Sequence, residues 1–292
     1  RKGKIMNLPA LLAEPNLLLA PGIYDSLSGL IATNAGAKVV YLSGASLAYT
    51  RFGISDLGLV SVSEVNDTLA AITDRIETPV IVDGDNGFGN ALNVQRTVRS
   101  FERSGAAAIQ LEDQAFPKRC GHLDGKTLIS KAEMVGKIKA ALDARNNQDM
   151  QIIARTDARA VEGLSAAVDR AEAYCEAGAD ILFIEAPQSL DEMKQLTAQF
   201  AGRIPLLANM VEGGKTPIQS TDELAEIGYK IAIFPGGAVR AIAHHLTDYF
   251  GQLIANGNNT KFAKKMYDFN GLNDVIETNA LLDLGIKYED KD

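Results

Sequence analysis

Polar and mostly acidic side chains stand at the ends of apolar segments throughout this 292-residue chain. The candidates are Ser43, Gly44, Asp83, Asp85, Glu112, Asp113, Arg155, Asp157, Glu185, Asn209 and Glu212. Any one of these acids could merely solvate a loop or cap a helix, but several carboxylates that converge without a cation would repel one another. Asp83 and Asp85 are two residues apart, so on a regular strand both would point to one side and could face one ion. A hard cation with oxygen ligands, Mg²⁺ or Mn²⁺, is therefore predicted.

Cys120 lies in a polar segment, PKRCGHLDGK, that follows one of these acidic ends. Lys118, Arg119 and a protonated His122 would lower the pKa of the thiol and favour the thiolate. Cys120 is therefore a candidate acid, base or nucleophile. The alternative is an incidental surface thiol.

The other cysteine and two neighbouring histidines carry weaker signals. Cys175 stands within the helical segment AEAYCEAG and is expected in the core, and His244 and His245 in AVRAIAHHL are expected to be structural or surface groups. The sequence contains no GxGxxG or Walker pattern, and GNAL after DNGFG resembles a phosphate-binding turn only weakly.

A repeated pattern indicates which elements position the candidate residues: a helical stretch ends in a small residue and Gly, and an apolar run follows. Four runs follow such a Gly, namely AKVVYLSG, AAAIQLED, ADILFIEA and YKIAIFPG, and four more resemble them, namely NLLLAPG, TPVIVDGD, MQIIARTD and IPLLANM. Nearly continuous apolar runs are typical of parallel strands covered on both faces. Eight strands alternating with helices predict a single (β/α)8 TIM barrel over residues 1–292 rather than a doubly wound sheet. The active site would then lie at the C-terminal strand ends.

Beyond Ile254 the segments 259–267 and 272–286 are helical in pattern but precede no further strand. They predict a C-terminal helical extension over residues 257–292.

Composition excludes several classes of protein. The net charge of −8 and the lack of a Lys/Arg cluster argue against nucleic acid as a partner. No apolar run approaches the length of a membrane span, and residues 1–9 do not resemble a secretory signal. Two cysteines cannot form a disulfide framework, so a soluble protein of the reducing cytoplasm is expected.

Six motifs occur in a fixed order: YLSG, VDGDNGFGN, LEDQ, KRCGH, ARTDA and NMVEGGKTP. Together they resemble the isocitrate lyase and phosphoenolpyruvate mutase superfamily over nearly the whole chain. The branch that the sequence resembles contains 2-methylisocitrate lyase, 2,3-dimethylmalate lyase and carboxyphosphonoenolpyruvate (carboxyvinyl-carboxyphosphonate) phosphonomutase. This resemblance implies Mg²⁺, a mobile gate loop, and a homotetramer whose subunits exchange a C-terminal helix.

The resemblance also implies a role for each matching residue. Asp85 would bind the metal directly, with Asp83 and Glu112 holding its waters. The catalytic set would be Cys120, Arg155, Lys118 and His122. The substrate, a small carboxylic acid, would contact Ser43, Gly44, Ala45, Asp56, Gly121, Arg155, Glu185 and Asn209. Asp56 lies in GISDLG, where Ser55 replaces the family's usual Pro.

The activity implied is a retro-Claisen cleavage of a 2-hydroxy di- or tricarboxylic acid, of the 2-alkylmalate, dimethylmalate or methylisocitrate type, to pyruvate or a related 2-oxoacid plus a carboxylate. In lyases of this family the cysteine that matches Cys120 is the proposed proton donor. Gly213 and Gly214 favour the dimethylmalate lyase and phosphonomutase types, and Gly236 and Gly237 would widen the pocket.

Three alternatives remain open: a P–C phosphonomutase, an oxaloacetate decarboxylase, and a non-enzymatic barrel that senses a dicarboxylate. The sensor would predict damage to the Asp83 and Asp85 pair or to Cys120, and all three residues are intact.

Overall fold

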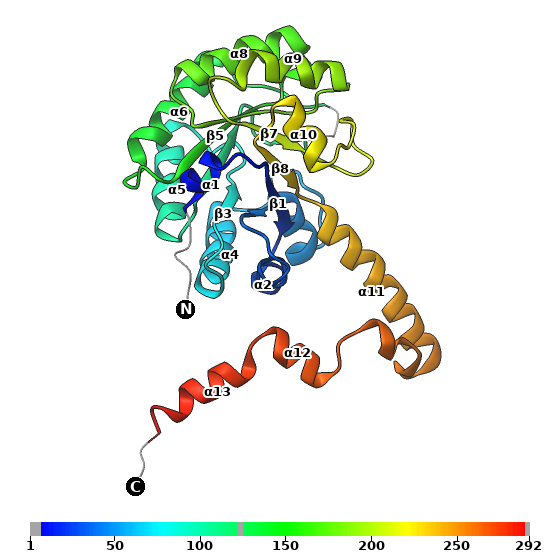
Figure 1. Ribbon diagram of the computed structural model, residues 1–292. Helices are drawn as coiled ribbons and strands as arrows, with labels where there is room; N and C mark the ends of the chain where they lie inside the picture. The colour runs from blue at the N-terminus through cyan, green and yellow to red at the C-terminus, as the bar shows by residue number, and fades with distance from the viewer. Residues whose placement is uncertain (1–6, 122–124, 290–292) are drawn as a thin grey trace. The chain divides into compact units, whose positions relative to one another are not determined.

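Eight parallel strands pair in chain order and close into a barrel, which confirms the predicted (β/α)8 architecture (Figure 1). The computed structural model describes residues 7–121 and 125–289. The chain divides into two compact units, Arg1–Val239 and Arg240–Asp292.

The strands are all short. Their bounds are β1 Leu18–Ile23, β2 Val40–Leu42, β3 Val80–Asp83, β4 Ala108–Glu112, β5 Gln151–Thr156, β6 Ile181–Ile184, β7 Leu206–Asn209 and β8 Ile231–Phe234. The ring closes where β1 pairs in parallel with β8, with Leu18 opposite Ile231.

Helices alternate with the strands and continue beyond the last one. Their bounds in the first unit are α1 Leu8–Ala13, α2 Ser26–Asn34, α3 Gly44–Leu47, the π-helix η1 Ala48–Phe52, α4 Val62–Arg75, α5 Ala91–Arg103, α6 Lys131–Ala144, α7 Ala158–Val161, α8 Leu164–Glu176, α9 Leu190–Phe200 and α10 Thr221–Ile227. Then follow α11 Gly237–Asn256, the 3-10 helix η2 Thr260–Lys265, α12 Phe269–Val275 and α13 Thr278–Ile286.

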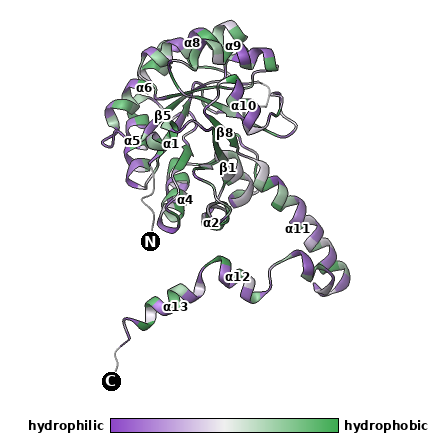
Figure 2. Cartoon of the chain, viewed as in Figure 1, coloured by the Kyte–Doolittle hydropathy of each residue, from purple (hydrophilic) through white to green (hydrophobic). Residues whose placement is uncertain are grey.

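Two apolar layers form the core of the first unit. Alternate strand residues such as Ile81, Ile153 and Ile233 fill the barrel interior. The intervening residues pack outward against the helices, where α6 contributes Met134 and Ile138. In Figure 2 the strands are accordingly green, whereas the surrounding helices carry both colours. Burial on both faces explains why the strands read as continuous apolar runs.

Helix α1 covers the N-terminal end of the barrel. Its Leu8 and Leu11 belong to the cluster that fills the interior. Asn7, which caps α1, donates to Asp149 just before β5 at 2.8 Å, and Lys230, just before β8, donates to the carbonyl of Glu14. A ligand must therefore enter from the opposite end, where the strands terminate.

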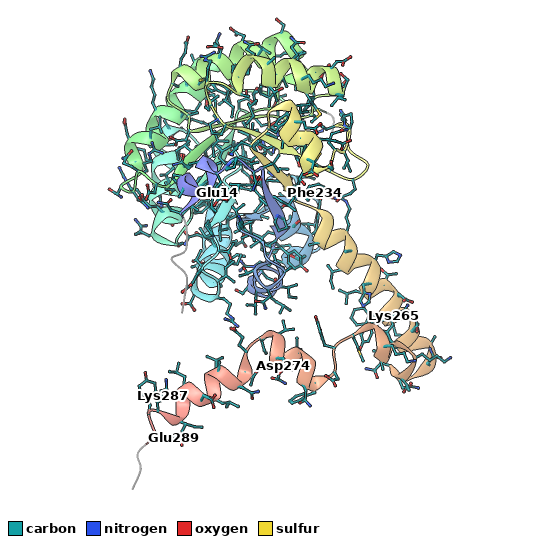
Figure 3. The ribbon with its side chains drawn as sticks, viewed as in Figure 1. Glu14, Phe234, Lys265, Asp274, Lys287 and Glu289 are labelled. Atoms are coloured by element: carbon teal, nitrogen blue, oxygen red, sulfur yellow. The ribbon has the colours of Figure 1, made fainter. Side chains whose placement is uncertain are left out.

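The second unit is a series of helices with little core of its own. Phe262 is buried between the rings of His245 and Tyr249, at centroid distances of 4.9 and 5.2 Å, while most other apolar side chains are exposed (Figure 3). Helix α11 runs unbroken to Asn256, and the unit begins at Arg240. The segment 272–286 is helical, as predicted, and Glu277 adopts a left-handed conformation between α12 and α13.

None of the helices among the described residues is long and apolar enough to cross a membrane.

Candidate active site

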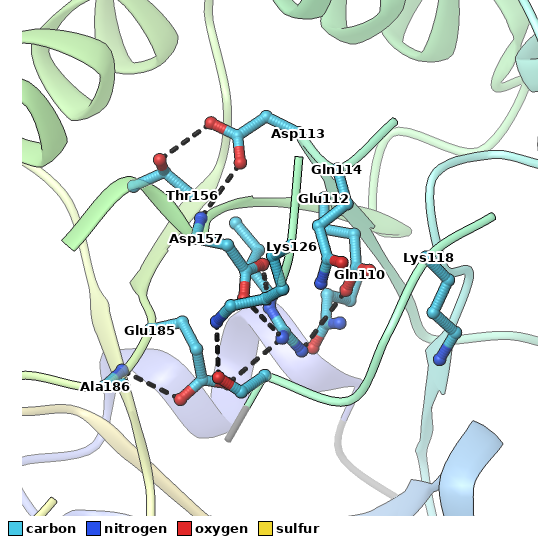
Figure 4. Close-up of polar contacts among 12 residues, drawn as sticks. Gln110, Glu112, Asp113, Gln114, Lys118, Lys126, Thr156, Asp157, Glu185 and Ala186 are labelled. Carbon is cyan, nitrogen blue, oxygen red and sulfur yellow. Dashed lines mark hydrogen bonds and ion pairs between the residues drawn. The ribbon is translucent and has the colours of Figure 1, made fainter. Parts of the chain in front are cut away.

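The inward-facing side of β4 and of β5 changes from apolar to charged toward the C-terminal end of the strand. On β4 the inward positions are Ala108, Gln110 and Glu112, and on β5 they include Ile153 and Arg155. Because side chains alternate along a strand, this one face carries both the packed interior and the charged mouth. Figure 4 shows the charged groups gathered at that mouth.

Asp83 and Asp85 do not share a regular strand, contrary to the prediction from their spacing. Asp83 is the last residue of β3, and Asp85 lies in the following loop with φ of 46°. The two carboxylates nevertheless approach one place, because a Cβ on Gly44 would lie 3.1 Å from Asp83 Oδ2 and 3.5 Å from Asp85 Oδ1. The backbone N–H of Gly44 also donates to Asp83 Oδ2 at 3.2 Å.

The loop that carries Asp85 is held from outside the barrel. The buried ammonium of Lys137, on α6, donates to the carbonyl of Asn86 at 3.0 Å, and the Thr97 hydroxyl donates to the carbonyl of Gly87 at 3.3 Å. These bonds stabilise the left-handed backbone of Asp85, which a residue with a side chain seldom adopts.

Lys118 supplies positive charge to this group of acids. Its buried Nζ lies 2.6 Å from Asp56 Oδ1 and 2.7 Å from Asp85 Oδ1. Burial raises the pKa of Asp85 to about 7, assisted by Asp83 and Asp56 and opposed by Lys118. The single positive charge of Lys118 therefore does not balance the negative charges of the three neighbouring carboxylates, Asp56, Asp83 and Asp85.

The donors on this side fit a hard divalent cation. The buried Oε1 of Glu112 accepts no hydrogen bond from any described residue, and burial raises the pKa of Glu112 well above its usual range, despite Arg155. Over 7–121 and 125–289 no three His, Cys, Asp or Glu side chains form a complete metal cage. Mg²⁺ needs no such cage, since it commonly takes one or two carboxylates and keeps several waters.

Arg155 lies at the centre of a second group of charges. Its guanidinium donates to Asp157 through Nε at 2.9 Å and Nη2 at 3.1 Å. Glu112 and Glu185 contact the same guanidinium at 3.3 and 3.2 Å. Burial alone would raise the pKa of Asp157, but Arg155 and Lys126 outweigh it and lower that pKa to about 2.

Gly121 brings the cysteine-bearing segment against this second group. A Cβ on Gly121 would lie only 2.5 Å from Arg155 Nη2 and 2.6 Å from Glu185 Oε2, so any larger residue would have to displace the ends of these two side chains. Its neighbour Cys120 is partly buried, and the backbone N–H of Cys120 donates to the carbonyl of Asp56 at 3.3 Å. The prediction for His122 lies outside the described residues.

Two more predicted substrate contacts meet beside Arg155. Asn209, at the end of β7, donates through Nδ2 to Glu185 Oε2 at 3.0 Å. Its Oδ1 is buried and accepts no hydrogen bond within the described part of the chain. That carbonyl oxygen could accept a hydrogen bond from a ligand.

Ser43, Gly44 and Ala45 form the turn that ends β2 and begins α3. Ser43 is buried and its hydroxyl accepts the N–H of Ser46 at 3.1 Å, which caps this four-residue helix. The structure therefore places the turn directly beside Asp83 and Asp85.

Asp113 does not face the mouth, although it follows Glu112. It accepts hydrogen bonds from Thr156 Oγ1 at 2.7 Å, Tyr174 Oη at 2.7 Å and Arg170 Nη1 at 3.2 Å. Adjacent residues of a strand point to opposite faces, so Asp113 lies between the barrel and α8.

Sequence reasoning also missed two buried residues of the site. Lys126 donates to Asp157 Oδ1 at 2.9 Å and to the carbonyl of Gly121. Gln114 donates to the carbonyl of Arg119 at 2.8 Å and accepts the N–H of Arg119 at 2.9 Å. Both lie within or beside the motifs LEDQ and KRCGH, but no spacing rule indicates where their side chains point.

Comparisons with known proteins identify the family of this chain. A model of the phosphoenolpyruvate phosphomutase family matches residues 8–254. The 2,3-dimethylmalate lyase of Eubacterium barkeri is 41% identical over 95% of this chain and 96% of its own length. The 2-methylisocitrate lyase of Aeropyrum pernix is 46% identical over 92% of this chain and 86% of its own length. The chloroplastic carboxyvinyl-carboxyphosphonate phosphorylmutase of Arabidopsis thaliana is 38% identical over 95% of this chain and 83% of its own length.

Similar solved structures include a lyase and two hydrolases. A crystal structure of 2,3-dimethylmalate lyase superposes with a TM-score of 0.90 at 35% identity, covering 96% of this chain and 93% of that one. The structure of oxaloacetate acetylhydrolase with 3,3-difluorooxalacetate gives a TM-score of 0.90 at 30% identity, covering 98% of this chain and 97% of that one. The structure of phosphonopyruvate hydrolase with oxalate and Mg²⁺ gives a TM-score of 0.87 at 29% identity, covering 96% of this chain and 97% of that one.

Proposed function

The chain belongs to the isocitrate lyase and phosphoenolpyruvate mutase superfamily and is a lyase of it, and from this premise we propose the bond that it breaks. It cleaves C2–C3 of a 2-hydroxy di- or tricarboxylic acid of the 2-alkylmalate, dimethylmalate or methylisocitrate type. The products are pyruvate or a related 2-oxoacid and a second carboxylate. The observation that carries the proposal is the position of the Cys120-Gly121 backbone against Arg155 and Glu185 at the barrel mouth.

The oxoacid end of the substrate would lie between the two groups of charges. Arg155 would bind its oxygen, and the turn of Ser43, Gly44 and Ala45 would bind its carboxylate. Glu185 and Asn209 would contact the variable part of the substrate, and Asp56 would hold Lys118 in place.

Asp85 would bind Mg²⁺, or Mn²⁺, with Asp83 and Glu112 holding its waters. The presence of Mg²⁺ in the phosphonopyruvate hydrolase structure and the all-oxygen donor set here support this assignment. When bound, the cation would supply Lewis-acid polarisation of the oxygens of the oxoacid.

The protein's own groups would then carry the charge and the protons of the reaction. The C2 hydroxyl loses its proton to a base, the C2–C3 electron pair passes to the leaving fragment, and C2 becomes the carbonyl carbon of the oxoacid. The leaving fragment is an enolate of a carboxylate, and the Cys120 thiol would donate a proton to its carbon. Such a proton donor has to be held close to that carbon to be effective.

We also propose a homotetramer in which the C-terminal unit docks on another subunit. Leu281 and Leu282 on α13 are 66% and 61% exposed, and large exposed apolar surfaces commonly mark protein contacts. Deleting 257–292 should break up the oligomer, so that the molar mass measured by light scattering corresponds to fewer subunits. An intact protein that is monomeric would contradict this assembly.

One assay tests the proposed activity. The protein is incubated with Mg²⁺ and 2-methylisocitrate, 2,3-dimethylmalate, other 2-alkylmalates, oxaloacetate or phosphonopyruvate, and both the loss of each substrate and the identity of its products are followed. The proposal predicts that a 2-hydroxy acid has the highest kcat/KM by at least about tenfold. Preferential turnover of phosphonopyruvate or oxaloacetate would replace it with a mutase or decarboxylase, and turnover of none would favour a sensor.

A further inference from the structure

Lys126 is a buried lysine to which the proposed reaction assigns no role. Its side chain is 1% exposed, and its Nζ donates to Asp157 Oδ1 at 2.9 Å and to the carbonyl of Gly121. Figure 4 shows this ammonium beside Asp157. An ammonium withdrawn from water is costly unless it is paired and hydrogen-bonded. Both bonds of Lys126 lead into the site.

The backbones of three consecutive residues around the thiol, Arg119 to Gly121, are each held by a different partner. Gln114 binds the N–H and carbonyl of Arg119, and the carbonyl of Asp56 accepts the N–H of Cys120. Lys126 binds the carbonyl of Gly121 and is the charged partner of the three. It is also the one that connects this segment to β5, through Asp157.

We propose that Lys126 is a positioning residue that fixes the Cys120-Gly121 backbone against Arg155, so that the thiol faces the leaving carbon. The catalytic part of this inference rests on the proposed function, because it takes Cys120 as the proton donor. The positioning part rests on the two bonds of Lys126 alone.

The charge arrangement separates catalysis from binding. Asp157 binds Arg155 by two hydrogen bonds that do not involve Lys126, so Arg155 keeps its orientation when Lys126 loses its charge. The Gly121 carbonyl, in contrast, loses its ammonium. A displacement of about 1 Å at a reacting group can lower the rate about 100-fold, whereas binding of the oxoacid end should change little.

The experiment compares Lys126→Met with Lys131→Met, both in a Cys175→Ser background that leaves Cys120 as the single thiol. Lys131 makes an exposed pair with Asp169 on the surface of α6 and is a control for loss of one lysine charge. Three quantities are measured on the Mg²⁺-loaded protein: kcat, the inhibition constant of oxalate, and the rate at which iodoacetamide alkylates Cys120.

Lys126→Met should lower kcat about 10- to 100-fold, change the oxalate constant less than about threefold, and change the alkylation rate at least about threefold. Lys131→Met should match the parent protein in all three. Parental kcat and alkylation in Lys126→Met would overturn the proposal. So would an oxalate constant that weakens as much as kcat falls, because Lys126 would then act on binding.

Cys120→Ser separates this inference from the proposed function. If Cys120→Ser keeps full kcat, the proton-donor role fails, and the alkylation rate of Lys126→Met still decides whether Lys126 positions the segment.

If Lys126→Met does not fold, Lys126→Gln takes its place. The glutamine amide can donate a hydrogen bond within the buried site but is one bond too short to bridge Asp157 and Gly121. Lys126→Gln should lower kcat while the oxalate inhibition constant changes little. Parental kcat and alkylation rate in this variant would overturn the proposal.

Discussion

The mouth of the barrel has two sides that solve the problem of buried charge differently. On the β3 side, Asp56, Asp83 and Asp85 share the ammonium of Lys118, and burial raises the pKa of Asp85 to about 7. On the β5 side, Arg155 and Lys126 both bind Asp157 and lower its pKa to about 2. Similar burial therefore gives opposite shifts, because the number of cations differs.

This difference indicates that the two sides have different roles. The β3 side retains negative charge that a bound cation could balance, whereas the β5 side has two cations, Arg155 and Lys126, and could hold a substrate and a proton donor in fixed positions. Changes on the β3 side should therefore alter metal binding with little loss of stability, and changes on the β5 side should alter stability as well.

The largest effect is expected from Asp85→Ala. It should lower turnover by about 10³-fold or more, since metal polarisation commonly contributes several kcal/mol to the transition state. The metal-free protein should keep its melting temperature, because a carboxylate is removed from a repulsive group. Mg²⁺ should raise Tm in the wild type but not in the variant, as measured by calorimetry. Full activity of Asp85→Ala, or of the wild type in EDTA, would refute the metal site.

Cys120→Ser should lower kcat by about 100-fold or more, because loss of a general acid commonly costs 10²–10⁴-fold. The affinity for oxalate, measured by titration calorimetry, should stay near that of the wild type, since Cys120 does not hold the oxoacid end. Cys175→Ser is the matched control and should retain full kcat. A fully active Cys120→Ser would refute the proton-donor role of Cys120.

Asp157→Asn tests the balance of the β5 side through pH. The folded-state pKa of Asp157, about 2, lies below the unfolded value of 3.8, so its ionisation stabilises the fold fully above pH ~4 and progressively less as the pH falls toward 2. At pH 7 the variant should lose about 2 kcal/mol of unfolding free energy. Urea unfolding should show this difference shrinking as the pH falls from about 4 toward 2, and a constant difference would mean that the Asp157 charge does not stabilise the fold.

The smallest effect is expected from Asp169→Asn, which breaks the exposed pair with Lys131 on the outside of the barrel. Solvent screens such pairs, so the free energy of unfolding should change by less than about 1 kcal/mol at pH 7. A loss as large as that of Asp157→Asn would show that burial is not what distinguishes the β5 side.

The eight strands were predictable because each is an apolar run buried on both faces and followed by polar residues. The order of the strands also followed from the alternation with helices. The helical extension was predictable from surplus segments, but its division at Glu277 was not, because the sequence there has no proline and no glycine at the break.

The candidate site was only partly predictable. That Glu112 and Arg155 reach the mouth follows from their place at strand ends. Asp113 was misplaced because the side of a strand that faces inward depends on its register within the closed barrel. Asp85 reaches the group through a loop conformation that no alternation rule describes.

The sequence by itself determined the barrel, the end at which polar groups collect, and the thiol-bearing segment beside them. Those features depend on local patterns of apolar and polar residues, which the chain carries whether or not it is folded. Only the tertiary structure decided that Lys118 compensates Asp56 and Asp85, while Lys126 connects Asp157 to Gly121. A lysine side chain can reach several partners, and which of them it meets depends on how the loops after separate strands approach one another once the barrel has closed.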